Sequence, residues 1–158
     1  MTVWTPTTFR DQVIQPALLA LDLYSKDAER LLLATAMTES NLTAVVQKGG
    51  GPALGYFQME DATHNDIFKN FLAWPEHQHL VEGLNKLSTR VGYADELAKN
   101  PQYAAAMARI HYLRNPDPLP FYLNLDAIWS YYKHWWNTEE GSATFTHFMQ
   151  ATKGLMGT

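Results

Sequence analysis

Residues 26–40 read Lys-Asp-Ala-Glu-Arg-Leu-Leu-Leu-Ala-Thr-Ala-Met-Thr-Glu-Ser, and this stretch decides the fold that the sequence predicts. Ser25 can cap a helix here, and Asp27 and Glu29 in the first turn suit the positive end of the helix dipole. Apolar or small side chains recur at the spacing of a core-facing helix face, at Ala28, Leu31, Leu32, Thr35 and Ala36. The sequence therefore predicts a helix that begins near Lys26 and packs against the core.

The next position on this face is Glu39, in the last turn of the predicted helix. A carboxyl on a buried face is partly desolvated, and desolvation raises its pKa because it disfavours the charged form. A carboxylic acid with a raised pKa can donate a proton near neutral pH, which makes Glu39 the candidate catalytic acid. The alternative is that Glu39 ends the helix and faces water, since buried unpaired glutamates are rare.

A glycine-rich loop, Gly49-Gly50-Gly51-Pro52, follows the predicted helix and cannot continue it. The segment Gly55-Tyr56-Phe57-Gln58-Met59 then supplies two aromatic rings, an amide and a thioether. Such a surface suits a sugar ring, which has hydroxyls at its edge and C–H groups on its face. Asp61, or less readily Thr63, can cap a short helix that begins after this segment and runs toward Phe68.

These residues resemble the lysozyme-like superfamily, and especially the soluble lytic transglycosylases with their bacteriophage relatives. In that family a helix ends in Glu-Ser, a loop follows, and a Gly-Leu-Met-Gln-like segment leads into a Pro-Ala-Thr helix start. Glu39-Ser40 matches the first feature, and Gly55 to Met59 with Ala62-Thr63 matches the second. Asp61 replaces the usual proline, and the family's Ala-Tyr-Asn-Ala-Gly segment is only faintly echoed by Tyr131-Tyr132 and Trp136-Asn137.

The resemblance implies a single lysozyme-like domain over residues 1–158, all-α or α with a minor hairpin. It also implies a muramidase that cuts peptidoglycan glycan strands between N-acetylmuramic acid and N-acetylglucosamine. By the same analogy Gln58 binds the substrate, and Tyr131 or Tyr132 holds the Glu39 carboxyl. The expected substrate contacts also include Ser40, Tyr56 and Phe57. Ser40 is expected to be structural and not a nucleophile, because no His and Asp are placed locally to activate it.

Cleavage of a glycosidic bond usually needs a second carboxylate as nucleophile or base. Glu60 and Asp61 are the nearest candidates after Glu39, although either could be only a charge at a helix N-terminus. The resemblance to lytic transglycosylases implies a route that needs one carboxylate. Glu39 first donates its proton and then takes one from the C6 hydroxyl of the sugar, which closes an anhydro ring without water. Transglycosylation is therefore favoured over hydrolysis.

The composition limits the function classes further. A chain of 158 residues suits one domain with a sizeable core, and the absence of cysteine excludes disulfides and thiolate metal sites. The net charge of −4 argues against a nucleic-acid partner, which would require clustered Lys and Arg. Aromatic residues make up 13%, which suits either an aromatic core or a carbohydrate groove. No cofactor or metal is expected.

The N-terminus, Met1 to Pro6, lacks the basic region and the apolar run of a secretory signal. No apolar stretch approaches the roughly 20 residues of a membrane span. We therefore expect a phage protein, associated with the virion or made in the host cytoplasm, that acts on the cell wall in the periplasm, and other virion proteins are further candidate partners. The alternatives are a virion structural protein that keeps the fold without activity, and a small helical binding module.

The remaining apolar pattern predicts helices and no convincing strand, with at most a small hairpin near Gly49 to Phe57. The expected helices run from a Thr8 cap to Leu21 with a kink at Pro16, from Asp61 to a point before Trp74, from Glu76 to Arg90 with a stop at Gly92, from an Asn100 cap with Pro101 at the first helical position to Asn115, from Asn124 to Asn137, and from about Ser142 to Gly154.

Overall fold

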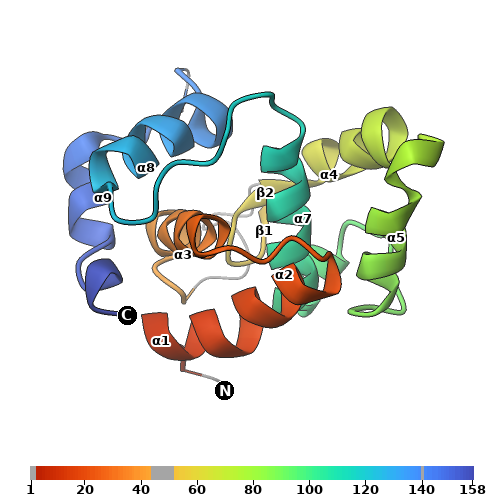
Figure 1. Ribbon diagram of the computed structural model, residues 1–158, viewed down its shortest axis with the longest axis horizontal. Helices are drawn as coiled ribbons and strands as arrows, with labels where there is room; N and C mark the ends of the chain where they lie inside the picture. Colours follow the sequence, from red (N-terminus) through yellow and green to blue (C-terminus); the bar gives the residue numbers. More distant parts are fainter. Residues whose placement is uncertain (1–2, 44–51, 140) are drawn as a thin grey trace.

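The computed structural model describes residues 3–43, 52–139 and 141–158 (Figure 1). This part of the chain is mostly helical with one two-stranded antiparallel sheet, so the predicted class, α with a minor hairpin, is confirmed. The elements follow in the order α1 (Pro6–Phe9), η1 (Arg10–Ile14), α2 (Gln15–Ala20), α3 (Lys26–Ser40), β1 (Ala53–Leu54), β2 (Met59–Glu60), α4 (Asp61–Ile67), η2 (Phe68–Leu72), η3 (Pro75–His77), α5 (Gln78–Asn85), α6 (Glu96–Lys99), α7 (Pro101–Leu113), α8 (Leu125–Tyr132), η4 (Lys133–Asn137), α9 (Phe145–Ala151) and η5 (Leu155–Gly157).

Helix α3 lies at the centre of one side of the molecule and contacts α1, α2, α7, α8 and α9 (Figure 1). Its start is as predicted, because the Ser25 hydroxyl accepts a hydrogen bond of 3.1 Å from the backbone N–H of Ala28. Leu33 and Met37, which lie off the predicted core-facing face, are buried as well. The expectation of one buried face was therefore too narrow, since neighbouring helices cover α3 on several sides.

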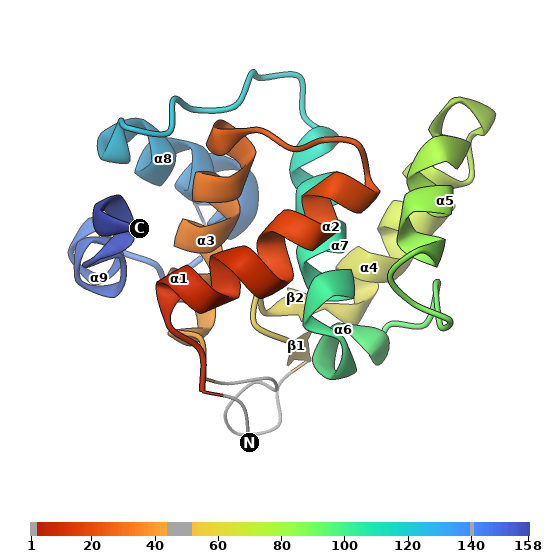
Figure 2. The ribbon, with the colours of Figure 1, turned by 60° about the horizontal axis from the view of Figure 1, so that its bottom comes forward.

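Helix α7 separates two groups of elements. Figures 1 and 2 both show α4 and α5 on one side of α7, and α3, α8 and α9 on the other. The cap that begins α7 was predicted, because the Asn100 side chain accepts a hydrogen bond of 3.1 Å from the backbone N–H of Tyr103. Asn124 caps α8 in the same way, and η4 extends that helix to Asn137 as expected.

The hairpin pairs Ala53 with Glu60 and Leu54 with Met59, so its second strand lies beyond the predicted segment. Gly49, Gly50 and Gly51, on which part of that prediction rested, lie outside the described residues. The turn needs a positive φ at Gly55, where a Cβ would lie 2.2 Å from the backbone oxygen of Leu97. This close approach explains the glycine at position 55.

Several helix ends differ from the prediction. The cap of the first helix is Thr5 and not Thr8, because their side chains form a reciprocal capping box before Pro6. Asp61 is the first residue of α4 and not its cap. Helix α5 ends at Asn85, well short of Arg90.

Candidate functional site

Glu39 lies in the last turn of α3, half-buried, and its Oε2 accepts a hydrogen bond from the hydroxyl of Tyr132 on α8. Burial raises the pKa of Glu39 above its ordinary value, while the Tyr132 hydroxyl and the nearby His147 act in the opposite direction. Burial and the Glu39 charge raise the pKa of Tyr132, so this phenol remains a hydrogen-bond donor at neutral pH. The alternative that Glu39 turns fully to water does not hold.

Aromatic packing fixes the position of Tyr132. Its ring stacks on Phe148 of α9 with centroids 6.0 Å apart and lies 6.2 Å from the ring of Trp129. Tyr132 and Phe148 are fully buried. Since α8 and α9 both contact α3, the packing of three helices positions the hydroxyl against the Glu39 carboxyl.

A cleft of about 360 Å³ opens beside this pair, and its walls come from α3, α8, η4, α9 and the segment before α9. Its lining residues are Thr38, Glu39, Tyr132, Asn137, Ser142, Ala143 and His147. Lys133 holds one wall in place, because its ammonium donates to the Asn137 side chain at 2.6 Å and to the backbone oxygens of Gly141 and Ala143, each at 3.0 Å. Glu39 therefore faces a preformed space.

His147 is one of the cleft residues that the sequence did not indicate, together with Thr38, Ser142 and Ala143. Its Nε2 lies 3.1 Å from the backbone oxygen of Thr38. A carbonyl oxygen can only accept, so Nε2–H is the donor, and Nδ1 does not take part in this hydrogen bond. The imidazole is exposed, and its charge lowers the pKa of Glu39. No local pattern could have indicated this residue, because it stands 109 positions from Thr38 in the sequence.

Of the two tyrosines expected to hold Glu39, the structure selects Tyr132. The hydroxyl of Tyr131 donates instead to the Asn115 side chain at 3.2 Å and to the backbone oxygen of Asp117 at 3.1 Å. Tyr131 therefore fastens the connector between α7 and α8 and does not line the Glu39 cleft.

Ser40 is buried at the end of α3, as expected for a structural residue. Its hydroxyl donates to the backbone oxygen of Ala36 at 3.0 Å and accepts from the backbone N–H of Leu42 at 3.2 Å. These two bonds close the helix end and occupy the hydroxyl. Ser40 is therefore not retained as a substrate contact.

The two aromatic side chains of the hairpin, Tyr56 and Phe57, do not line the Glu39 cleft. Phe57 is 1% exposed and packs near Phe9, so its expected role as a sugar-binding surface is wrong. Tyr56 accepts a hydrogen bond of 3.2 Å from the indole N–H of Trp4, and its ring lies edge-on to Phe9. Sequence alone did not distinguish these core-facing rings from a surface for carbohydrate.

Gln58 lines a smaller cavity of about 90 Å³ together with Met59, Glu60, Thr63, His111 and Trp136. Its side-chain amide donates to the backbone oxygen of Gly55 at 2.8 Å, which supports the turn. Glu60 and Asp61 are exposed, and the Asp61 carboxylate accepts from the backbone N–H of Ala62 at 2.8 Å. Neither lines the Glu39 cleft, so within the described residues Glu39 is the only carboxylate there.

His64, four residues after Glu60, is fully buried and serves the core. Its Nε2 lies 2.8 Å from the Tyr103 hydroxyl and its Nδ1 lies 3.0 Å from the Asn65 side-chain oxygen. Burial lowers the pKa of His64. In the ranges that the structure covers, no three His, Asp or Glu side chains converge in a way that could hold a metal ion.

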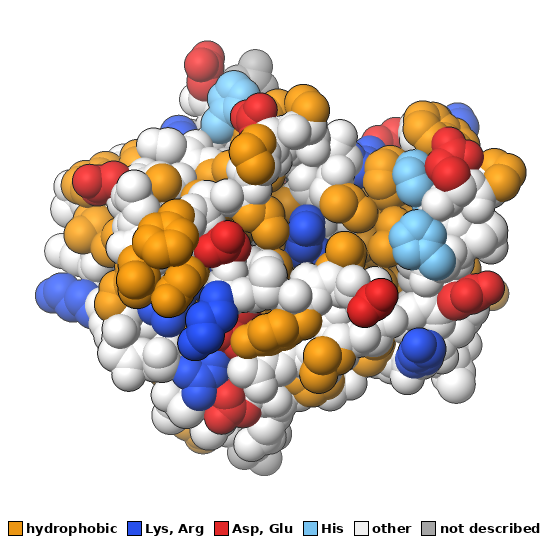
Figure 3. All heavy atoms as spheres, viewed as in Figure 1, with side chains coloured by type: hydrophobic (Ala, Val, Ile, Leu, Met, Phe, Trp, Pro, Cys, Tyr) orange, Lys and Arg blue, Asp and Glu red, His pale blue; other side chains and the backbone are white. Residues whose placement is uncertain are grey.

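Comparison of the chain with models of protein families, with curated proteins and with solved structures finds no match. None of the helices in the described ranges has both the length and the apolar character needed to cross a membrane. On the face that Figure 3 shows, Lys and Arg side chains lie near Asp and Glu and form no continuous basic stripe.

Proposed function

We propose that this protein is a lysozyme-like muramidase that cleaves the glycan strands of peptidoglycan, with Glu39 as the catalytic acid. One observation carries the proposal: a carboxyl with a raised pKa is held by a tyrosine hydroxyl at the wall of a cleft of about 360 Å³. A raised pKa makes Glu39 more protonated at a given pH than an ordinary glutamate, which favours its use as a general acid.

The contacts of the carboxyl suggest which oxygen acts. Because Tyr132 donates to Oε2, the transferable proton belongs on Oε1. In the first step this proton passes to the glycosidic oxygen as the C1–O bond breaks, which leaves an oxocarbenium-like sugar and a Glu39 carboxylate. The Tyr132 hydrogen bond strengthens as that negative charge forms, since hydrogen bonds to charged acceptors are the stronger ones.

The absence of a second carboxylate among the described lining residues supports transglycosylation over hydrolysis. In the second step the Glu39 carboxylate takes the proton of the C6 hydroxyl, whose oxygen bonds to C1 and closes the anhydro ring. Glu39 then regains its protonated form, so no water is consumed. As a phage protein acting on the wall, the enzyme would serve entry or host lysis.

The proposal is tested by incubating wild type, Glu39→Gln and Glu60→Gln with peptidoglycan sacculi and identifying the released muropeptides by mass spectrometry. We expect products with anhydro ends from wild type and Glu60→Gln and none from Glu39→Gln. Products with reducing ends would indicate hydrolysis instead. If wild type released nothing from several wall types, the enzyme proposal would be wrong, and a structural role in the virion would take its place.

A further inference from the structure

Arg109 is a buried cation that the mechanism above does not use. It is the one Lys or Arg of α7, and 7% of its surface is exposed. It does not line the Glu39 cleft. Arginine side chains are rarely buried to this degree unless a carboxylate pairs with them. The surroundings of Arg109 therefore require an explanation.

No negative charge compensates Arg109. Within the described ranges, no carboxylate oxygen lies within 4 Å of its nitrogen atoms. Burial lowers the pKa of Arg109, and the nearby Tyr131 of α8 acts in the opposite direction. Burial also raises the pKa of Tyr131, so this phenol is neutral at neutral pH and supplies no charge. Since a guanidinium stays protonated in proteins, Arg109 remains an unpaired cation.

The nitrogen atoms of Arg109 differ in their access to solvent. Nε is enclosed by the protein and has no hydrogen-bond partner. Nη1 and Nη2 have no partner among the described residues either, but they are not enclosed, so both belong to the small exposed part of the side chain. Figure 3 shows that the surface is hollowed over α7, where a Lys or Arg side chain lies between hydrophobic side chains. The outer edge of the guanidinium is therefore open, whereas its inner edge is closed.

This arrangement has the chemistry of an anion site. The N–H groups of Nη1 and Nη2 on the outer edge are parallel donors, which match two oxygens of a carboxylate or a phosphate. Water reaches little of the side chain, so the positive charge of Arg109 is poorly hydrated. Charges attract each other more strongly where water is excluded, which favours an anion over water at this edge.

We propose that the outer edge of Arg109 binds one oxyanion group, a carboxylate or a phosphate, through two parallel hydrogen bonds from Nη1 and Nη2. Chloride, which is a single atom, cannot accept this pair of hydrogen bonds in the same geometry. The site lies outside the Glu39 cleft, so the proposal goes beyond the cleavage of glycan and does not depend on it.

The test is the melting temperature of the full-length protein while sodium acetate or sodium phosphate replaces sodium chloride at constant ionic strength. For a chain of this size, a ligand at about ten times its dissociation constant should raise the melting temperature by roughly 3 °C. We expect a saturable rise of this order for wild type and none for Arg109→Met, which keeps a long side chain but has no N–H donors. A general effect of the salt would raise both proteins equally.

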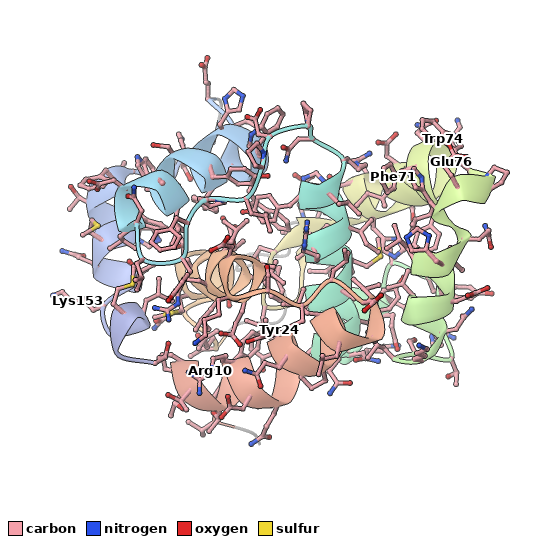
Figure 4. All side chains as sticks on the ribbon, in the orientation of Figure 1. Arg10, Tyr24, Phe71, Trp74, Glu76 and Lys153 are labelled. Carbon is pink, nitrogen blue, oxygen red and sulfur yellow. The ribbon has the colours of Figure 1, made fainter. Side chains whose placement is uncertain are left out.

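Arg10→Met is the matched control. Arg10 is paired with the Asp11 carboxylate at 2.8 Å and lies on the N-terminal helix, apart from α7 (Figure 4). Its replacement also removes one guanidinium, so the two variants have the same net charge. Arg10→Met should keep the rise in melting temperature that Arg109→Met loses.

A spectroscopic measurement covers the case in which Arg109→Met fails to fold. Enclosure protects the Arg109 Nε–H from exchange with water, so its resonance should be observable in wild type. This resonance should shift saturably with acetate or phosphate and not with chloride, while the Nε–H resonance of Arg10 should not shift.

The outcomes separate the possible ligands. A response to acetate alone supports the site and indicates a carboxylate ligand, and a response to phosphate alone supports it and indicates a phosphorylated ligand. An equal response of wild type and Arg109→Met would overturn the proposal. Where that variant does not fold, an unshifted Arg109 resonance would overturn it. None of these measurements involves peptidoglycan, so the cleavage proposal and the anion site can fail separately.

Discussion

Replacing Tyr132 by Phe removes the hydroxyl that donates to Glu39 and keeps the ring that stacks on Phe148. A hydrogen bond to a charged group contributes about 1.5–3 kcal/mol. Because Glu39 is half-buried, solvent screens part of this interaction. We therefore take the lower end of the range, about 1.5 kcal/mol, as the contribution of this hydrogen bond. Each 1.4 kcal/mol corresponds to about tenfold in rate, so Tyr132→Phe should slow cleavage roughly tenfold.

The same change should alter the pH dependence of cleavage. Burial raises the pKa of Glu39, and the Tyr132 hydrogen bond lowers it. Loss of this hydrogen bond should therefore raise the pKa of Glu39 further. Because Glu39 must begin protonated, the decline of activity at high pH should move to higher pH. The assay is the initial rate of muropeptide release from sacculi across a pH series.

Tyr131→Phe is the matched control, because its hydroxyl bonds to Asn115 and to the backbone of Asp117 and not to Glu39. It should leave the pH profile of cleavage unchanged. If Tyr132→Phe matched wild type in both rate and pH profile, or if Tyr131→Phe produced the same shift, the role assigned to the Tyr132 hydroxyl would be refuted.

Four further predictions concern stability and the cleft. Burial raises the folded-state pKa of Glu39, so ionising it lowers the free energy of unfolding above that pKa and leaves it unchanged below the ordinary value. Glu39→Gln should therefore raise the free energy of unfolding at neutral pH by about 1 kcal/mol or less, observed as a higher melting temperature, and the gain should vanish in acid. The charge of His147 lowers the pKa of Glu39, so His147→Asn should move the decline of the cleavage rate at high pH to a higher pH. His134→Asn should leave that decline unchanged, because His134 does not line the cleft. Lys133→Met removes three hydrogen bonds and should cost roughly 2 kcal/mol in denaturant unfolding. Gly55→Ala places a Cβ 2.2 Å from the Leu97 oxygen at positive φ and should cost about 2 kcal/mol or more in the same measurement.

Features that depend on neighbouring residues could be predicted from the sequence. The Ser25 and Asn100 caps depend on side chains three positions from their backbone partners, and both were identified correctly. The partial burial of Glu39 also followed from helical spacing, since this residue continues the pattern that includes Leu32 and Ala36.

Features assembled by distant contacts could not be predicted. His147 reaches the cleft because α9 packs on α3, and no residue near it in the sequence signals that contact. Phe57 was assigned to a binding surface because an aromatic side chain has the same composition signal in a core and in a carbohydrate groove. The choice of Tyr132 over Tyr131 required the packing of α8, which decides which of two adjacent rings faces α3.

The most direct test of the central claim is the digestion of sacculi in water enriched in oxygen-18, with wild type and Glu39→Gln in parallel. We predict that wild type releases anhydro muropeptides that contain no oxygen-18 at the new ends, and that Glu39→Gln releases none. Labelled reducing ends that depend on Glu39 would contradict the anhydro route. Release of the same products by both proteins, or no release by either, would contradict the assignment of Glu39 as the acid of a glycan-cleaving site.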